Sequence, residues 1–560
     1  MNRKALQFSN KNRSKYIDKI SNEHFDLIVI GGGITGAGIA LDAALRGLKV
    51  VLLEKNDFAS GTSSKSTKLI HGGLRYLKQF EIRLVRETGL ERAVAHKNAC
   101  HLVHPENMLL PIVEEGTFNQ FTAGLAIRVY DILANVDENH RRRKLSFEDV
   151  RKIEPSLRDD ILKSGILYAE YRTDDARLTI EIIKAARRHS AETLNYMEVS
   201  GFEYKDDKVS GVICHDHMTN QKVKFNGKVI VSSTGPWVDE VRQIDKPNTK
   251  TNLHLTKGVH IVVNKEDFNI KNSIYFDAFD GRMLFAIPRG EVVYIGTTDT
   301  NFKGDQDELN CTEEDATYIL NAVNNMFKGE SLTLDHIQST WTGLRPLIQQ
   351  EGKGPSELSR KEEIFVAESD LISIAGGKLT GYRKMAERIV DLVVDKLPSK
   401  YPDCATKEFK IHNNPFVDYN AYEQEIKQLK TTHKADTILI KNMAYLVTTY
   451  GKDANIIIEN YKNKLSSQKV SSSKDLLVEA QLEYSLEYEA LGEVLDFIDR
   501  RTGWLFFNIE DARTYTQFVA EQMAAYLSKN DAWIQYQVDQ TIEKININSL
   551  ADIKAKSKVS

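Results

Sequence analysis

Two short apolar runs flank a helical stretch near the start of the chain. Residues 25–30 have the length and composition of a buried strand, and residues 48–53 form a second run of the same kind. Between them, residues 35–46 carry apolar side chains at the spacing of a helix. The pattern predicts a βαβ unit.

The middle of the chain contains further short apolar runs. Most of them are bounded by glycine or proline, which end strands and begin turns. They predict a region of mixed α and β structure. The strand candidates are residues 229–232, 259–263, 283–287, 292–295 and 371–374.

The pattern changes after about Asp391. Long helical patterns rich in Lys and Glu follow, such as residues 435–450 and 477–500, and strand signals become few. Two prolines near residue 400 mark the change. We expect a first domain of residues 1–398 and a helical C-terminal domain of residues 399–560.

The composition fits a large globular protein. At about 100 to 200 residues per domain, 560 residues suggest two to four units. A hydrophobic fraction of 41% and a charged fraction of 28% argue against disorder and against a membrane-spanning bundle. The net charge of −4 offers no field that attracts nucleic acid, so no nucleic-acid partner is expected.

The cellular compartment is indicated by what the chain lacks. Residues 1–25 are polar and mixed in charge, without the apolar run of a secretory signal. The four cysteines are far apart and lack metal-ligand spacing, so neither a disulfide framework nor a metal site is expected. No stretch approaches the roughly 18 apolar residues of a spanning helix. We expect a cytoplasmic protein whose membrane contact, if any, is peripheral.

Gly31, Gly33 and Gly36 follow the first predicted strand in the spacing GxGxxG. This spacing provides a tight turn, close backbone approach to a pyrophosphate and close packing of helix on strand, and the helix N-terminus favours the phosphate charge. Glu54 ends the second predicted strand, where an acidic residue binds ribose hydroxyls. The unit predicts dinucleotide binding and leaves NAD and FAD both open.

A second glycine turn favours FAD. Gly376 and Gly377 follow the predicted strand 371–374 and lead into a helix that begins near Thr380. The N-terminus of such a helix would stabilise the negative charge that develops on a reduced flavin. The alternative is an ordinary turn between a strand and a helix.

Six segments between residues 31 and 380 resemble, in the same order, those of the aerobic FAD-dependent glycerol-3-phosphate dehydrogenases. They are residues 31–36, 62–77, 234–237, 296–299, 343–346 and 376–380. Where the family commonly has SSKLIHGG, this chain has Ser66-Thr67-Lys68-Leu69-Ile70-His71-Gly72-Gly73, and Gly381 stands where a small polar residue is common. Both departures are mild.

The resemblance implies an α/β fold. Its parts are a Rossmann-like FAD-binding domain with an inserted antiparallel-sheet substrate domain, and an all-helical C-terminal domain. Non-covalent FAD is implied, because no histidine or cysteine stands in a context typical of a covalent flavin link. The implied cofactor-binding residues are Gly31, Gly33, Gly36, Glu54, Thr62, Ser63, Ser66, Thr67, His71, Thr234, Gly235, Gly376, Gly377 and Thr380.

The same resemblance implies an enzyme that oxidises sn-glycerol 3-phosphate to dihydroxyacetone phosphate by hydride transfer to FAD and passes the electrons to a quinone. Arg75, Tyr76, Arg360 and Lys378 are implied to anchor the substrate, and Arg345 to contact its reacting hydroxyl. Arginine suits a phosphate dianion because its guanidinium donates two parallel hydrogen bonds. For any single arginine the alternative is a surface ion pair.

Hydride transfer from an alcohol also needs a proton acceptor. His260 is the first candidate, because an imidazole titrates near the working pH. A buried structural histidine inside a strand is the rival interpretation. His71 is the second candidate, and it would alternatively pack against the isoalloxazine.

Three other functions stay open at this point. A glycerol-3-phosphate oxidase would return the electrons to oxygen, but such oxidases usually carry an insertion for which 560 residues leave little room. A non-catalytic flavoprotein has no need of Arg75, Arg345 and Lys378 converging on the flavin. A soluble NAD-linked dehydrogenase has no need of the second glycine turn.

The partners follow from the chemistry. A quinone acceptor lies in the bilayer, which favours peripheral contact with the inner face of the cell membrane. A homodimer and the role of the helical domain are left open.

Overall fold

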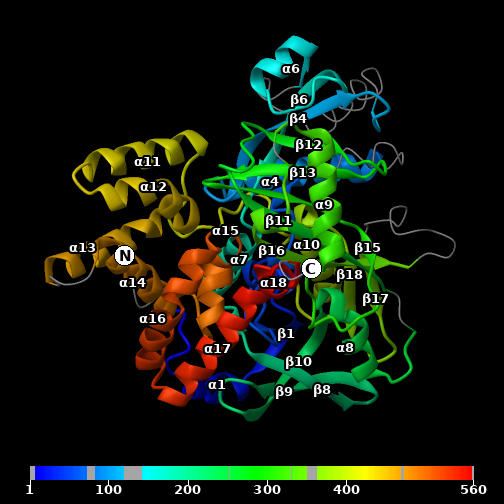
Figure 1. Ribbon diagram of the computed structural model, residues 1–560. Helices are drawn as coiled ribbons and strands as arrows, with labels where there is room; N and C mark the ends of the chain where they lie inside the picture. Colours follow the sequence, from blue (N-terminus) through cyan, green and yellow to red (C-terminus); the bar gives the residue numbers. More distant parts are fainter. Residues whose placement is uncertain are drawn as a thin grey trace.

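The computed structural model describes residues 7–71, 82–118, 142–250, 253–329, 331–349, 362–467 and 472–557. Figure 1 shows a sheet region with β1, β8, β9 and β10 in the lower half, a second sheet region with β4, β6, β12 and β13 above it, and a group of helices on one side. The three parts pack against one another.

The first sheet has parallel strands at its centre. β1 (His24–Ile30) lies between β10 (Gln221–Ser232) and β2 (Val50–Leu53), and β18 (Ile372–Gly376) runs parallel to the far edge of β10. The carboxyl ends of these four strands therefore meet at one edge of the sheet. The remaining strands are β7 (Glu192–Leu194), β8 (Met197–Lys205), β9 (Lys208–Asp216) and β17 (Glu362–Val366).

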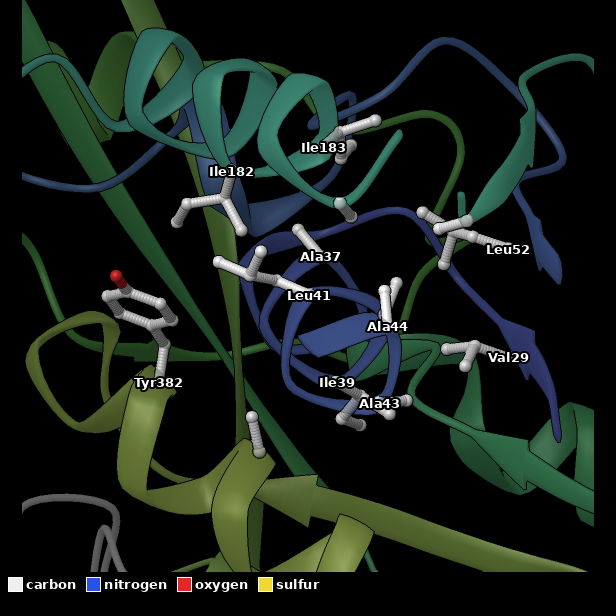
Figure 2. Packing of buried hydrophobic residues seen from close by; sticks show 14 of the residues in the cluster. Val29, Ala37, Ile39, Leu41, Ala43, Ala44, Leu52, Ile182, Ile183 and Tyr382 are labelled. Carbon is white, nitrogen blue, oxygen red and sulfur yellow. The ribbon is translucent and has the colours of Figure 1, made fainter. Parts of the chain in front are cut away.

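Helix α2 (Ile34–Leu45) packs between two other helices. It is apolar on nearly all sides and lies against α7 (Asp175–Arg188) and α10 (Tyr382–Asp395). Figure 2 shows Leu41 of α2 directed towards Ile182 of α7, with Tyr382 of α10 beside them. Because an all-round apolar helix is stable only when covered on every side, this packing fixes the start of α2 over the sheet edge.

The second sheet is almost entirely antiparallel. Near one edge of this sheet, β11 (Leu253–Asn264) pairs with β14 (Val292–Gly296) and, along nearly its whole length, with β16 (Ile337–Ile348). β12 (Ser273–Asp277) and β4 pair in parallel, which is the exception. The other strands are β3 (Leu69–Ile70), β4 (His104–Val113), β5 (Arg143–Leu145), β6 (Leu162–Arg172), β13 (Met283–Arg289) and β15 (Thr300–Asn301).

Helices cover the second sheet on both faces. α9 (Glu313–Met326) buries Ile319 and Val323 against Val259 and Ile261 of β11. On the other face, helices from the C-terminal part share a core with Trp341 of β16. Alternating residues of a strand point to opposite faces, which is why β11 contributes to both cores.

From Tyr419 onward, the described residues form helices and their connections. These helices are α11 (Tyr419–Thr432), α12 (Thr437–Tyr450), α13 (Ala454–Ser467), α14 (Ser473–Tyr488), α15 (Trp504–Phe507), α16 (Ile509–Leu527), α17 (Asp531–Asn548) and α18 (Ala551–Ser557). Shorter or peripheral helices elsewhere are α1 (Arg13–Ser21), α4 (Ile82–Asn98), α6 (Phe147–Ile153) and α8 (Val238–Asp245).

The predicted fold class is confirmed. The βαβ unit and all five strand candidates are present, and helices follow the connection at residues 396–418. The predicted domain limit at residues 398 and 399 falls in this connection, and the division into domains there stays a prediction.

One helix prediction was wrong. The periodic pattern of residues 477–500 predicted a single helix, but α14 ends at Tyr488 and a π-helix follows only at Asp496–Arg501. Ala490, between them, adopts a φ of 49°. The physical reason lies in tertiary contacts. At the break the buried Glu489 pairs with Arg177 of α7, and beyond it Arg500 and Arg501 pair with Asp57 of the first sheet region.

No helix in the described part of the chain combines the length and the apolar character needed to cross a bilayer.

Candidate active site

A cavity of about 840 Å³ lies between the two sheets. On one side it is lined by the carboxyl ends of β1, β2, β10 and β18, and on the other by β11, β16 and the β12–β13 hairpin. In open α/β sheets, ligands bind at this edge of the parallel strands. Every described site candidate except Gly36 lines this one cavity: Gly31, Gly33, Glu54, Thr62, Ser63, Ser66, Thr67, His71, Thr234, Gly235, His260, Arg345, Gly376, Gly377, Lys378 and Thr380.

The first glycine turn leaves no room for side chains. Gly31 has a φ of 103°, and a Cβ on it would lie 2.7 Å from the carbonyl oxygen of Ser233. A Cβ on Gly36 would lie 1.9 Å from the carbonyl oxygen of Gly31, so Gly36 acts by letting α2 pack closely on the turn. Gly33 caps α2 without a side-chain hydrogen bond, and Ser63 Oγ accepts from the Ile34 N–H at 2.9 Å. The turn and the helix end form a backbone cradle of the kind that holds phosphate.

Glu54 closes the same end of the cavity. Its Oε2 accepts from the Gly32 N–H at 2.6 Å, and its Oε1 accepts from the Asn56 N–H at 2.9 Å. Burial raises the pKa of Glu54, and these two N–H groups oppose the rise. The carboxylate is thus held beside the glycine turn.

Two further glycine turns complete this edge. Gly235 has a φ of 55° after β10, and Gly376 and Gly377 have φ values of 77° and 83° after β18. A Cβ on Gly377 would lie 2.5 Å from the sulfur of Met385 in α10. Thr380 Oγ1 donates to the carbonyl oxygen of His71 at 3.1 Å, which ties the β18 turn to the end of the 62–71 segment.

The guanidinium of Arg345 is fixed in place on β16. Its Nη2 donates to Thr297 Oγ1 at 2.8 Å, and its Nη1 donates to the carbonyl oxygen of Thr298 and to Asp299 Oδ1, each at 3.1 Å. A Cβ on Gly258 would lie 2.3 Å from Nη2, so the neighbouring strand has a glycine where the guanidinium crosses it. Arg345 is therefore a preorganised cation at the cavity wall.

His260 of β11 is buried, with 2% of its surface exposed. Its ring stacks on Trp341 with centroids 4.6 Å apart and planes 12° apart, and its Nε2 lies 3.0 Å from Thr67 Oγ1. Burial, together with the charges of Arg345 and Lys68, holds the pKa of His260 well below its usual value. The imidazole is neutral at physiological pH, which is compatible with a proton acceptor and also with the rival structural role.

His71 also lines the cavity, with its ring centroid 6.1 Å from that of Phe285. Lys378 caps the 3₁₀ turn Leu379–Gly381 at the cavity wall. Arg75, Tyr76 and Arg360 lie outside the described residues, so their roles stay predictions.

Sequence reasoning missed Lys65. It lines the cavity beside Thr67, and its Nζ lies 2.9 Å from Asp499 Oδ2 in the π-helix. Burial lowers the pKa of Lys65 to about 8, although Asp499 opposes the shift. The position of Lys65 inside the 62–77 segment could have identified it as a site residue. Nothing in the sequence indicated that Asp499 would be its partner.

The cavity fits a dinucleotide with a second ring system. Its glycine cradle and Glu54 suit the pyrophosphate and ribose, as in dinucleotide-binding folds. The side chain of Trp237 also lines the cavity, beside the turn at Gly235. Gly376 and Gly377 line the same cavity, where the sequence predicts a second cofactor segment.

The chain is similar to known flavin-dependent enzymes along most of its length. The family model for FAD dependent oxidoreductases matches residues 26–382, and the model for the C-terminal domain of alpha-glycerophosphate oxidase matches residues 404–533. The aerobic glycerol-3-phosphate dehydrogenase of Bacillus subtilis is 43% identical over 544 residues, which cover 96% of this chain and 97% of the relative. That of Staphylococcus haemolyticus is 42% identical over 97% of both chains.

Solved structures show the same likeness. The glycerol-3-phosphate dehydrogenase from Bacillus halodurans, complexed with FAD, has a TM-score of 0.82 and 38% identity, with 97% of this chain and 98% of that chain covered. The L-alpha-glycerophosphate oxidase from Mycoplasma pneumoniae has a TM-score of 0.55 at 18% identity, covering 70% of this chain and 99% of that chain, and shows a shared fold alone. With a glycine cradle, a second flavin-type turn and near full-length similarity to these enzymes, the chain belongs to the FAD-dependent oxidoreductases, in the family of aerobic glycerol-3-phosphate dehydrogenases.

Proposed function

We propose that the chain oxidises sn-glycerol 3-phosphate to dihydroxyacetone phosphate and that the electrons pass to a quinone. Bound FAD supplies the hydride acceptor for this reaction. The observation that carries the proposal is the position of Arg345 and Lys378, two cations on different elements that line the same cavity as the glycine cradle. A flavin with only a structural role would need no such pair.

The two cations suit different parts of the substrate. Arg345 is already paired with Asp299 at 3.1 Å, so its net charge is partly compensated, and it suits a neutral hydroxyl. Lys378, at the start of a helical turn, suits the phosphate. By the same proposal Arg75, Tyr76 and Arg360 complete the phosphate site.

His260 is the proposed proton acceptor. Its neutral ring lines the cavity and can accept a proton at Nε2, which lies 3.0 Å from Oγ1 of the cavity-lining Thr67. Burial destabilises the protonated, positively charged form of His260, so the ring would have to release the proton again quickly. His71 remains the second candidate for this role.

The acceptor proposal has support in the shape of the cavity. Part of its wall is aromatic and apolar, formed by Phe118, Tyr168, Tyr275, Met283 and Phe285. The rings of Tyr275 and Phe285 stack with centroids 4.4 Å apart. A phosphorylated triol gains little from such a wall, whereas a flat quinone ring packs well on it. Access to a bilayer quinone supports peripheral contact of a cytoplasmic protein with the inner membrane face.

The test is anaerobic mixing of the purified holoenzyme with sn-glycerol 3-phosphate while the flavin absorbance at about 450 nm is followed. Bleaching that a soluble quinone analogue reverses much faster than air supports the proposal. Rapid reversal by air with release of peroxide would indicate the oxidase instead. Glycerol is the matched control, because it lacks the phosphate that Lys378 is proposed to bind. A flavin that does not bleach with the phosphate ester refutes the substrate assignment.

A further inference from the structure

Asp175 lies outside the cavity, yet its carboxylate binds the loop that lines it. It is the first residue of α7 and is completely buried. Its Oδ2 accepts from the Ser66 N–H at 3.0 Å and from the Ser66 hydroxyl at 2.6 Å. Its Oδ1 lies 2.5 Å from the Lys68 ammonium and 3.0 Å from the Ala176 N–H. One carboxylate thus receives four donors, including a cation.

Further contacts hold the loop at residues 65–68. The Trp341 indole N–H donates to the carbonyl oxygen of Ser66 at 3.2 Å, and Thr67 Oγ1 lies 3.0 Å from His260 Nε2. Lys68 adopts a φ of 57°, a conformation that a lysine rarely holds without such contacts. Between these two supports, Lys65, Ser66 and Thr67 line the cavity.

We propose that Asp175 is a positioning residue for the cofactor, which acts through Ser66 and Lys68 to hold the 65–68 loop in its cofactor-binding conformation. This inference rests on the proposed cofactor role of residues 65–67. Asp175 itself does not line the cavity, so it touches neither cofactor nor substrate. The arrangement is that of a second layer of residues that orients the groups in direct contact with a ligand.

The ionic contact explains why an aspartate is used. Lys68 is 2% exposed, and its ammonium is close to the rings of Trp341 and Phe506. A buried ammonium without a carboxylate is costly, and Asp175 is the carboxylate in direct contact with Lys68, so it stabilises this path of the loop. An amide at position 175 would keep the shape but would lose the charge and two acceptor sites for hydrogen bonds.

The experiment measures FAD release from the holoenzyme without any substrate. In Asp175→Asn we expect the dissociation constant of FAD to rise about tenfold or more, as for other residues that support a ligand site from behind. The absorption spectrum of the bound flavin should also change, because the cavity wall moves. Since no substrate is present, the result stands even if the proposed oxidation of glycerol 3-phosphate fails.

Glu154→Gln is the matched control. Glu154 is 1% exposed and likewise accepts several hydrogen bonds, from the N–H groups of Lys271 and Asn272 and from the Ser156 hydroxyl, but it does not line the cavity or contact the loop. We expect Glu154→Gln to lower the thermal midpoint while the FAD dissociation constant and the spectrum stay at wild-type values. If Asp175 has only a structural role, Asp175→Asn will also lower the thermal midpoint without changing the FAD dissociation constant or the spectrum. That result would overturn the proposal.

A double-mutant cycle tests the route through Ser66. Ser66→Ala removes the hydroxyl that bonds Asp175, so adding Asp175→Asn should weaken FAD binding less than it does in the wild type. Fully additive effects would overturn the proposed route. If Asp175→Asn fails to fold, Lys68→Met decides, because Lys68 contacts Asp175 but does not line the cavity: weaker FAD binding there supports the proposal, and an unchanged FAD dissociation constant contradicts it.

Discussion

Asp57 and Arg501 form a two-pronged ion pair although 444 residues separate them in the sequence. Arg501 Nη1 lies 2.5 Å from Asp57 Oδ2, and Nη2 lies 3.0 Å from Oδ1. Both side chains are buried, and Arg500 Nε adds a third contact to Asp57 at 2.7 Å. Asp57 lies just after β2 and Arg501 ends the π-helix, so this pair joins the C-terminal helices to the sheet that carries the glycine cradle.

Removal of the Asp57 charge should destabilise the whole protein. Asp57→Asn removes the carboxylate nearest to the buried Arg501 guanidinium, whereas Arg500 keeps Asp496 and Asp499. Breaking a buried ion pair costs about 3–5 kcal/mol of unfolding free energy in comparable cases. Denaturant unfolding of the holoenzyme measures the loss. Asp307→Asn, which removes an exposed carboxylate paired with Lys55, is the control and should change little. A loss of less than about 1 kcal/mol in Asp57→Asn would show that the pair is not a main link.

Asp57 also predicts an acid dependence. Burial alone would raise its pKa, but Arg501 and Arg500 outweigh burial and lower the pKa to about 2. A carboxyl with a depressed folded pKa contributes stability above its unfolded pKa of about 3.9, and this contribution disappears as the pH falls towards 2. Asp57→Asn should therefore have a flatter stability curve between about pH 4 and pH 2 than the wild type.

Glu493 should give a pH dependence of stability opposite to that of Asp57. Burial and the charge of Asp496 raise the pKa of Glu493 to about 7. The unfolded chain loses this proton near pH 4.3 while the folded protein keeps it, so stability falls as the pH rises from about 4.3 to 7. Glu493→Gln should stabilise the protein at pH 8 by on the order of 1 kcal/mol and flatten that interval. The exposed Glu487→Gln is the control, and equal behaviour of the two variants would contradict the prediction.

Replacement of Arg345 should impair the reaction more than cofactor binding. Arg345→Lys keeps a positive charge but loses the planar group that contacts Thr297, Thr298 and Asp299. We expect kcat/KM for glycerol 3-phosphate to fall about a hundredfold, with the flavin content unchanged. Arg242→Lys is the matched control, because Arg242 pairs with Asp239 at 2.9 Å and is similarly buried, but does not line the cavity. Equal losses in both variants would argue for a structural role.

His260→Asn separates the two interpretations of this histidine. If His260 is the proton acceptor, its replacement should lower kcat about 10² to 10⁴-fold, with a smaller change in KM. Because its pKa is held well below the usual value, the wild-type rate should show no loss attributable to His260 as the pH falls through 6.5. A variant with normal kcat and a lower thermal midpoint would assign His260 to packing on Trp341.

Local sequence determined the parts of this protein that depend on short-range geometry. The GxGxxG turn could be recognised because a close approach of backbone to phosphate tolerates only glycine, and Gly36 meets the Gly31 carbonyl oxygen directly. The strands were recognisable because buried strands need continuous apolar runs of fixed length. Glu54 and the turn at Gly376 could be placed because both directly follow such strands.

The tertiary structure decided what depends on partners distant in sequence. The helical pattern of residues 477–500 contains only one weak sign of a break, Gly492, and it gives no sign that Arg500 and Arg501 pair with Asp57 on another part of the chain. Likewise, Asp175 reads as an ordinary residue at a helix start, and only the folded protein places it under the 65–68 loop. Local sequence patterns determine the helices and strands, whereas the partners of buried charges are decided by the folded chain. Each buried charge must then be paired, because burial makes an unpaired charge costly.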